Sequence, residues 1–200
     1  MPNDPGQKPP RPIAARPLRK ADWPLIEELF GDNGACGGCW CMFWRIPKGG
    51  AYWDAQKGEG NRRAFRKLVE RGAATGVLAL DGKTPIGWAS VAPRADFAYF
   101  DRSRTIPPPA DEKTWSVTCF FVKRGWRRRG VAGALLAEAV DYASRKKARL
   151  IEGYPAASWD GAKMPDAFVH TGLPSLFEAA GFEFAEAAGA RAVWRRRLAG

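Results

Sequence analysis

The sequence predicts one α/β domain in which helices pack against a central sheet. Strand-like and helix-like segments follow one another in the order β-α-α-β-β-β-α-β-α-β. The length of 200 residues, 46% of them apolar, is sufficient for one full hydrophobic core. An Asp81-Gly82 dipeptide between two apolar runs is the strongest hairpin signal in the chain. These features favour a folded, sheet-containing domain over a disordered chain.

The chain begins with a proline-rich segment. Residues 1–12 contain five prolines, a composition typical of a disordered or extended lead-in. The predicted domain covers residues 13–200 and starts with a short strand at residues 13–18. We find no internal repeat.

Two helices are expected next. Residues 21–30 predict a helix because Asp22 can cap its start and Pro24 lies in its first turn, where the missing N–H costs nothing. Residues 61–71 predict a second helix from the spacing of their apolar side chains. Residues 31–50, between the two, are rich in glycine and aromatic side chains, so irregular structure is expected there.

The middle of the chain predicts the main strands. Residues 75–82 and 85–93 form the two arms of the hairpin. A polar, proline-rich loop follows at residues 94–113, and then a buried strand of β-branched and aromatic residues at 114–122. Residues 130–147 predict the longest helix, with an apolar stripe along one side.

The C-terminal part predicts three further elements. Residues 148–155 form a strand, and residues 173–182 contain a short helix that ends at Gly181. Residues 191–198 form the last strand.

The most informative segment is the basic loop "RGWRRRG" between the strand at 114–122 and the longest helix. The first N–H groups of a helix have no partner within it and carry the positive end of the helix dipole, so an anion can bind there. Gly130 would allow a phosphate to approach the backbone closely, and the arginines add positive charge. The segment therefore predicts a phosphate site, although neither G-x-x-x-x-G-K-[ST] nor G-x-G-x-x-G occurs in the chain.

The spacing Arg127-x-x-Gly130-x-Ala132 resembles the acyl-CoA-binding motif of the GNAT superfamily of N-acetyltransferases. That motif reads Gln/Arg-x-x-Gly-x-Gly/Ala and lies between the fourth strand and the third helix. The order of elements over about residues 13–198 and the segment "LFEAAGF" at 176–182 are also similar to the family. The resemblance implies the GNAT-like fold, a central mixed, mostly antiparallel, twisted sheet flanked by helices. It also implies an enzyme that moves an acetyl group from acetyl-CoA to an amine of a small molecule or peptide, by direct attack.

The resemblance further implies where acetyl-CoA would bind. The pyrophosphate would lie on the N–H groups of residues 128–133, and the pantetheine arm would follow the strand at 119–122. A backbone N–H near Phe121 and Val122 would polarise the thioester carbonyl. The predicted cofactor-binding residues are Phe120, Phe121, Val122, Arg127, Arg128, Arg129, Gly130, Val131, Ala132 and Gly133.

The proton-transfer groups are less clear from the family pattern. Many members carry a tyrosine acid in a segment like "Y-E-x-x-G-F", but Phe177 stands at that position here. We predict Tyr154 as the replacement acid and Glu152, at the end of a strand, as the base. The alternatives that stay open are a core or rim aromatic for Tyr154 and an ion-paired surface glutamate for Glu152.

The cysteines raise the question of a metal. Cys36, Cys39 and Cys41 form C-x-x-C-x-C, and Cys119 or His170 could complete a zinc site. Because a second C-x-x-C is missing, we predict no metal and expect free thiols.

The same segment is where the resembled family builds its acceptor site. Trp40, Phe43, Trp44 and Arg45 would form an aromatic wall with one cation, suited to an apolar or anionic substrate. His170 is a further candidate for contact with the substrate. The alternative is a loop that only packs over the core.

Two other function classes stay open. A net charge of +11 and the clusters 127–129 and 195–197 suggest nucleic-acid binding, but no known nucleic-acid-binding pattern is present. The missing tyrosine also leaves a non-catalytic acyl-CoA sensor as an alternative.

We expect an amine acceptor as partner, no specific nucleic acid and no membrane, and a homodimer stays open. The N-terminus has no apolar signal segment, and the sequence has no apolar run long enough to span a membrane. A cytoplasmic location is therefore expected.

Overall fold

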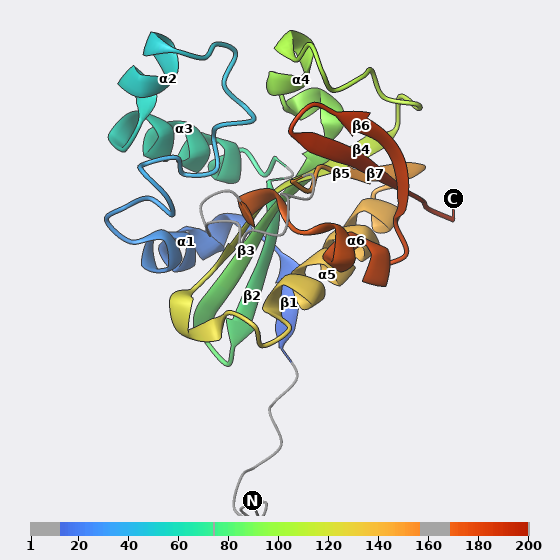
Figure 1. Cartoon of the computed structure of the whole chain (residues 1–200). Helices are drawn as coiled ribbons and strands as arrows, with labels where there is room; N and C mark the ends of the chain where they lie inside the picture. Colours follow the sequence, from blue (N-terminus) through green and yellow to red (C-terminus); the bar gives the residue numbers. More distant parts are fainter. Residues whose placement is uncertain (1–12, 74, 157–168, 200) are drawn as a thin grey trace, which may run out of the picture.

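A seven-stranded sheet forms the centre of the protein, with the strand order β1-β2-β3-β4-β5-β7-β6 (Figure 1). The structure is a computed structural model and describes residues 13–73, 75–156 and 169–199. Neighbouring strands are antiparallel except for β4 and β5, which are parallel. This confirms the predicted fold class. The strands are β1 (Ala14–Pro17), β2 (Gly76–Asp81), β3 (Thr84–Pro93), β4 (Thr114–Val122), β5 (Leu150–Gly153), β6 (Glu183–Ala188) and β7 (Arg191–Arg197).

Helices cover both faces of this sheet. The longest, α5, packs on one face, where Leu135 and Ala139 are fully buried with Val77 of β2. On the opposite face, Ile26 of α1 and Phe65 of α3 are fully buried in a second cluster (Figure 1). The helices are α1 (Trp23–Phe30), α2 (Ala51–Gln56), α3 (Glu59–Glu70), α4 (Tyr99–Arg102), α5 (Val131–Arg145) and α6 (Pro174–Ala179).

The main predicted elements are confirmed, including the hairpin between β2 and β3, in which Asp81 pairs with Thr84. Three elements were not predicted, namely α2, α4 and β6. α2 and α4 have only six and four residues, too few to show a helical period. β6 has the sequence EFAEAA, which is poor in strand-forming residues, and its pairing with β7 holds it in the sheet.

Asp22 is the N-cap residue of α1, as predicted, but its side chain makes no capping hydrogen bond. Its carboxylate instead turns back, accepting the Arg19 backbone N–H at 2.8 Å and pairing with Arg16. Pro24 does lie in the first turn of α1, as expected.

The strands β4 and β5 diverge, which opens a gap in the sheet between them. The two strands pair only from Thr114–Leu150 to Val117–Gly153. The register between β3 and β4 also shifts between Val117 and Cys119, which leaves Thr118 as an extra residue in β4. β4 then continues to Val122 while β5 ends at Gly153, so the second half of β4 has no strand on its β5 side among the described residues.

The lead-in predicted for residues 1–12 lies outside the described residues. Within the described part of the chain, no helix is long and apolar enough to cross a membrane.

Candidate active site

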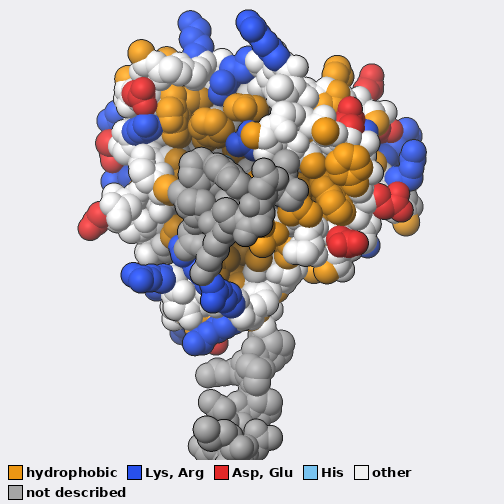
Figure 2. All heavy atoms as spheres, viewed as in Figure 1, with side chains coloured by type: hydrophobic (Ala, Val, Ile, Leu, Met, Phe, Trp, Pro, Cys, Tyr) orange, Lys and Arg blue, Asp and Glu red, His pale blue; other side chains and the backbone are white. Residues whose placement is uncertain are grey.

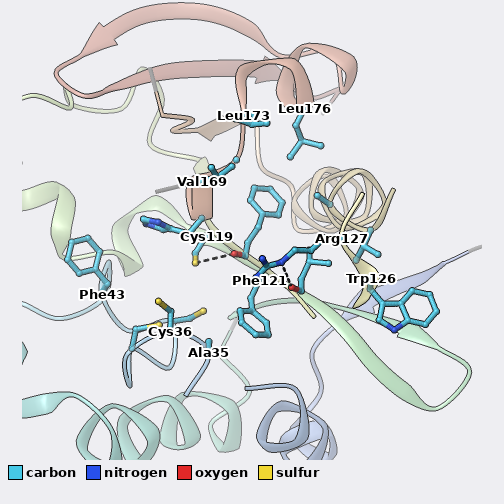
Figure 3. Close-up of a pocket in the computed structure, with 18 of the residues that line it drawn as sticks. Ala35, Cys36, Phe43, Cys119, Phe121, Trp126, Arg127, Val169, Leu173 and Leu176 are labelled. Carbon is cyan, nitrogen blue, oxygen red and sulfur yellow. Dashed lines mark hydrogen bonds between the residues drawn. The ribbon is translucent and has the colours of Figure 1, made fainter. Parts of the chain in front are cut away.

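A cavity of about 810 Å³ occupies the space where β4 and β5 diverge. Ala35 and Cys36 lie on one side of it, and Leu173 and Leu176 lie on the opposite side (Figure 3). Figure 2 shows hydrophobic side chains on both sides of the centre of this face, with Lys and Arg side chains mainly toward its rim. A mostly apolar cavity of this size is typical of a small-molecule site.

The end of β4 and the start of α5 form one end of the cavity. Gly130 caps α5 with φ +79°, a left-handed conformation that glycine adopts without strain. The first backbone hydrogen bond of the helix is donated by the Ala134 N–H to the Gly130 carbonyl, at 3.0 Å. The N–H groups of residues 131–133 therefore have no acceptor within the helix. A Cβ added at Gly130 would meet no atom within 4 Å, so open space lies directly beside these N–H groups.

Nearly all the predicted cofactor-binding residues line this cavity. The exception is Arg129, whose guanidinium lies 5.4 Å from the centre of the Trp126 ring. Arg127 donates from Nε to the Val122 carbonyl at 3.3 Å, which ties the basic loop to the end of β4 (Figure 3). The lining members are Phe120, Phe121, Val122, Arg127, Arg128, Gly130, Val131, Ala132 and Gly133.

Aromatic rings form the other end of the cavity. Phe43 lies 6.0 Å from Trp44 and 5.4 Å from Trp53, ring centre to ring centre. Phe43, Trp44 and His170 line the cavity, as expected for substrate-binding residues. Trp53 and Arg191 also line it and were not predicted. Trp53 lies on a helix that the sequence did not indicate.

Trp40 and Arg45, which were expected in the acceptor site, do not line the cavity. Trp40 stacks on Trp23 at 5.8 Å and is buried in the cluster beneath the loop. The Arg45 side chain is almost fully buried, 3.8 Å from Asp96 and 4.4 Å from the centre of the Phe97 ring. Desolvation lowers the pKa of Arg45 to about 10. Their positions indicate a supporting role for both residues.

All four cysteines of the chain line the cavity as free thiols. The Cys39 thiol donates to the Gly34 carbonyl at 3.7 Å and the Cys119 thiol to the Phe120 carbonyl at 3.8 Å, and the Cys41 thiol neighbours both. The contact with the Cys41 thiol, with help from backbone N–H groups, outweighs burial and lowers the pKa of Cys39 to about 6. The same contacts and full burial raise the pKa of Cys41. In the part of the chain that the structure describes, no group of three or more His, Cys, Asp or Glu residues could hold a metal ion.

Comparison of the sequence with protein families identifies the chain. A family model described as "Acetyltransferase (GNAT) family" matches residues 41–155, which contain β2 to β5, α5 and the basic loop. The chain belongs to the GNAT acetyltransferase family. Comparison with curated proteins finds no match.

Solved GNAT acetyltransferases share the fold of this enzyme at low sequence identity. An N-acetyltransferase from Staphylococcus aureus Mu50 is 16% identical, with a TM-score of 0.53 over 94% of this chain and 99% of that one. The PaiA N-acetyltransferase from Thermoplasma acidophilum, solved with coenzyme A, is 13% identical (TM-score 0.53, 94% and 99% covered). A phosphinothricin acetyltransferase from Sinorhizobium meliloti, solved with AcCoA, is 20% identical (TM-score 0.53, 93% and 88% covered).

Glu152 and Tyr154 lie outside the cavity lining of this acetyltransferase. Both side chains are fully buried. The Glu152 carboxylate accepts hydrogen bonds from Arg94 at 2.8 Å, Arg195 at 2.8 Å and the Tyr154 hydroxyl at 2.7 Å. The Tyr154 hydroxyl also lies 2.9 Å from Ser116 Oγ and accepts from Arg94 at 2.7 Å. Desolvation and the nearby Glu152 charge raise the pKa of Tyr154 well above its ordinary value.

The catalytic roles of Glu152 and Tyr154 stay predictions, and the structure places both side chains in one buried network. Two guanidinium groups and the Tyr154 hydroxyl contact the carboxylate of Glu152. Three polar partners surround the Tyr154 hydroxyl. Phe177, at the position of the family's usual acid, is fully buried and packs 6.1 Å from Phe120.

Proposed function

We propose that this acetyltransferase moves the acetyl group of acetyl-CoA to an amine, which attacks the thioester directly. The observation that carries the proposal is the cavity between β4 and β5, which ends on the open N-terminus of α5 at Gly130. Family membership favours this activity over a sensor or a nucleic-acid-binding role. Two related structures hold coenzyme A or AcCoA, which supports acetyl-CoA as the co-substrate.

The basic loop would hold the pyrophosphate. The N–H groups of residues 131–133 point out of the first turn of α5, and the helix dipole favours an anion there. Arg127 and Arg128 line the same end of the cavity and add two positive charges. Gly130 leaves the space that a phosphate needs.

The second half of β4 would hold the pantetheine arm. Its backbone groups on the β5 side have no strand partner among the described residues, so they can bond the amides of the arm. When bound, acetyl-CoA supplies the activated acetyl group. A backbone N–H near Phe121 and Val122 would then stabilise negative charge on the thioester oxygen during attack.

Glu152 and Tyr154 are assigned a structural role in this proposal. Their network joins β5 to Arg195 of β7 and to Arg94, which follows β3, and so fixes the strands beyond the point of divergence. Neither Glu152 nor Tyr154, the predicted base and acid, lines the cavity. Two other titratable side chains, Cys39 and His170, do line it. The acceptor amine would therefore lose its proton to one of these two groups or to water.

An acetyl-transfer assay tests the function. The purified chain is incubated with acetyl-CoA and a panel of amines, and coenzyme A release and acetylated product are measured by thiol titration and mass spectrometry. Acetyl-CoA, but not adenosine, should raise the melting temperature, because a ligand that binds only the folded state stabilises it. If millimolar acetyl-CoA causes no thermal shift, the proposal fails.

A further inference from the structure

The charged side chains among the described residues of the cavity wall are positive, apart from a single thiol. No Asp or Glu is among the described residues that line the cavity, whereas Arg127, Arg128 and Arg191 do line it. The one acidic group there with a lowered pKa, the Cys39 thiol, already has a partner in the Gly34 carbonyl. An acceptor with several positive charges would lose its hydration on entry and find no carboxylate to replace it. The wall therefore disfavours polyamines and lysine-rich peptides.

Of the three arginines that line the cavity, Arg191 is the one placed to bind the acceptor. Arg127 and Arg128 lie in the basic loop, beside the proposed pyrophosphate site, whereas Arg191 is the first residue of β7. Its backbone is held by a bridge to Ala156, and its guanidinium lies 5.1 Å from the centre of the Trp44 ring. No carboxylate among the described residues pairs with it. A positioned guanidinium with no carboxylate partner among the described residues, at the edge of an apolar cavity, is suited to bind a carboxylate.

The surface next to Arg191 is aromatic. Trp44 contacts both Arg191 and Phe43, and Phe43 in turn contacts Trp53. The rings meet edge to face, at 89° for Phe43 and Trp44 and 78° for Phe43 and Trp53, so they form an angled apolar wall with few polar atoms, against which an aromatic group can pack. An acceptor that fits this site therefore carries an apolar or aromatic group close to its carboxylate.

We infer that the acceptor is a free amino acid with an aromatic side chain, or a close analogue, whose carboxylate binds Arg191 and whose ring packs on Phe43 and Trp53. The inference rests on the proposed acetyl transfer and narrows it. It excludes the N-terminus of a peptide, because the first residue of a peptide carries an uncharged amide where a free amino acid carries its carboxylate.

Three matched acceptors test this inference. Phenylalanine, phenylalanine amide and 2-phenylethylamine share the ring and the amine and differ only at the carboxylate. The wild-type kcat/KM should be highest for phenylalanine. Arg191→Met should lower it ~30-fold for phenylalanine, as expected when a hydrogen bond between charged groups is lost, and change it less than ~3-fold for the amide. Arg191→Lys should restore part of the loss, and Arg197→Met, on the same strand but exposed and outside the cavity, should have no effect.

Product binding provides a second measurement that does not require turnover. In the presence of coenzyme A, N-acetylphenylalanine should raise the melting temperature more than its amide does, and Arg191→Met should remove the difference. The inference is overturned if the amide serves as well as the acid in both measurements, or if spermidine or a lysine peptide is the better acceptor. Failure of the proposed function looks different, since acetyl-CoA itself would then fail to bind.

Discussion

Arg94 and Glu152 form a buried ion pair, with Nη1 of the arginine 2.8 Å from Oε2 of the glutamate and both side chains nearly inaccessible to water. Two charges removed from water in this way stabilise the fold only while each has its partner. Arg195 adds a second guanidinium to the same carboxylate at 2.8 Å. The pair joins residues 58 positions apart in the sequence, and neither residue lines the cavity.

Glu152→Gln separates a structural role from a catalytic one. If Glu152 holds the two arginines, the change leaves buried charge uncompensated and should lower the free energy of unfolding by ~3–5 kcal/mol. Turnover per folded molecule should then stay within a few fold of wild type. Urea unfolding and steady-state kinetics below the new melting point measure the two quantities, and Glu183→Gln, exposed on β6, is the control.

The opposite result would restore Glu152 as the base. In that case turnover falls by ~100-fold or more, the acid limb of the pH–rate profile disappears, and the stability hardly changes.

Tyr154→Phe tests the other member of the network. The ring stays, but Glu152, Arg94 and Ser116 each lose a hydrogen-bond partner. The expected loss of stability is ~1–3 kcal/mol, with turnover nearly unchanged. A large fall in turnover at normal stability would instead indicate that Tyr154 protonates the leaving thiolate.

The raised pKa of Tyr154 also predicts a pH dependence of stability. The unfolded tyrosine ionises near its ordinary pKa, whereas the folded one keeps its proton to much higher pH. The contribution of Tyr154 to stability is therefore constant below the ordinary value and is lost as the pH rises above it. Urea midpoints between pH 8 and 11 should fall more steeply for the wild type than for Tyr154→Phe.

Gly130 is the residue on which acetyl-CoA binding should depend most. Alanine at φ +79° should cost ~1–2 kcal/mol of stability from backbone strain. Valine carries the same strain and also fills the space beside the N–H groups of α5. Calorimetry should show acetyl-CoA affinity lower by ~10–100-fold in Gly130→Val, as expected when bonds to a charged phosphate are lost.

Gly125→Ala is the matched control for this loop. A Cβ at Gly125 would also meet nothing within 4 Å, and its φ is not in the left-handed region. It should leave both stability and affinity unchanged. Wild-type affinity in Gly130→Val would mean that the phosphates bind elsewhere.

Local patterns in the sequence explain why most of the predicted cofactor-binding residues lie together at one end of the cavity. The strand, the basic loop and the start of α5 are continuous between residues 114 and 133, so spacing alone places Arg127 and Gly130 together. The acceptor half is different, because Arg191 reaches Trp44 only through the pairing of β7 with β5. No short-range pattern encodes that contact.

The Glu152 network shows a second limit of sequence reasoning. A glutamate near the end of a strand indicates a surface ion pair or a base equally well, until its partners are known. Arg94 lies in a segment expected to be a polar loop, yet its side chain is buried against the ring of Phe100 at 4.0 Å. Burial of a loop arginine depends on tertiary packing, which the pattern of apolar residues does not contain.

Cys39 should be the most reactive thiol of the protein near neutral pH. Its pKa of about 6 means that the reactive thiolate is the main form at pH 7 and is lost as the pH falls below 6. Alkylation of Cys39 by iodoacetamide, followed by peptide mass spectrometry, should therefore rise with pH through a midpoint near 6. Cys41 should stay unmodified in the folded protein, because it is buried and its pKa is raised. Since the Cys41 thiol is the largest cause of the low pKa, Cys41→Ala should move the midpoint for Cys39 upward.

Bound N-acetylphenylalanine should slow the reaction in the wild type, because Cys39 lines the same cavity. If Cys39 reacts only above pH 8, or if Cys41→Ala leaves its midpoint unchanged, the thiol contacts do not control its ionisation.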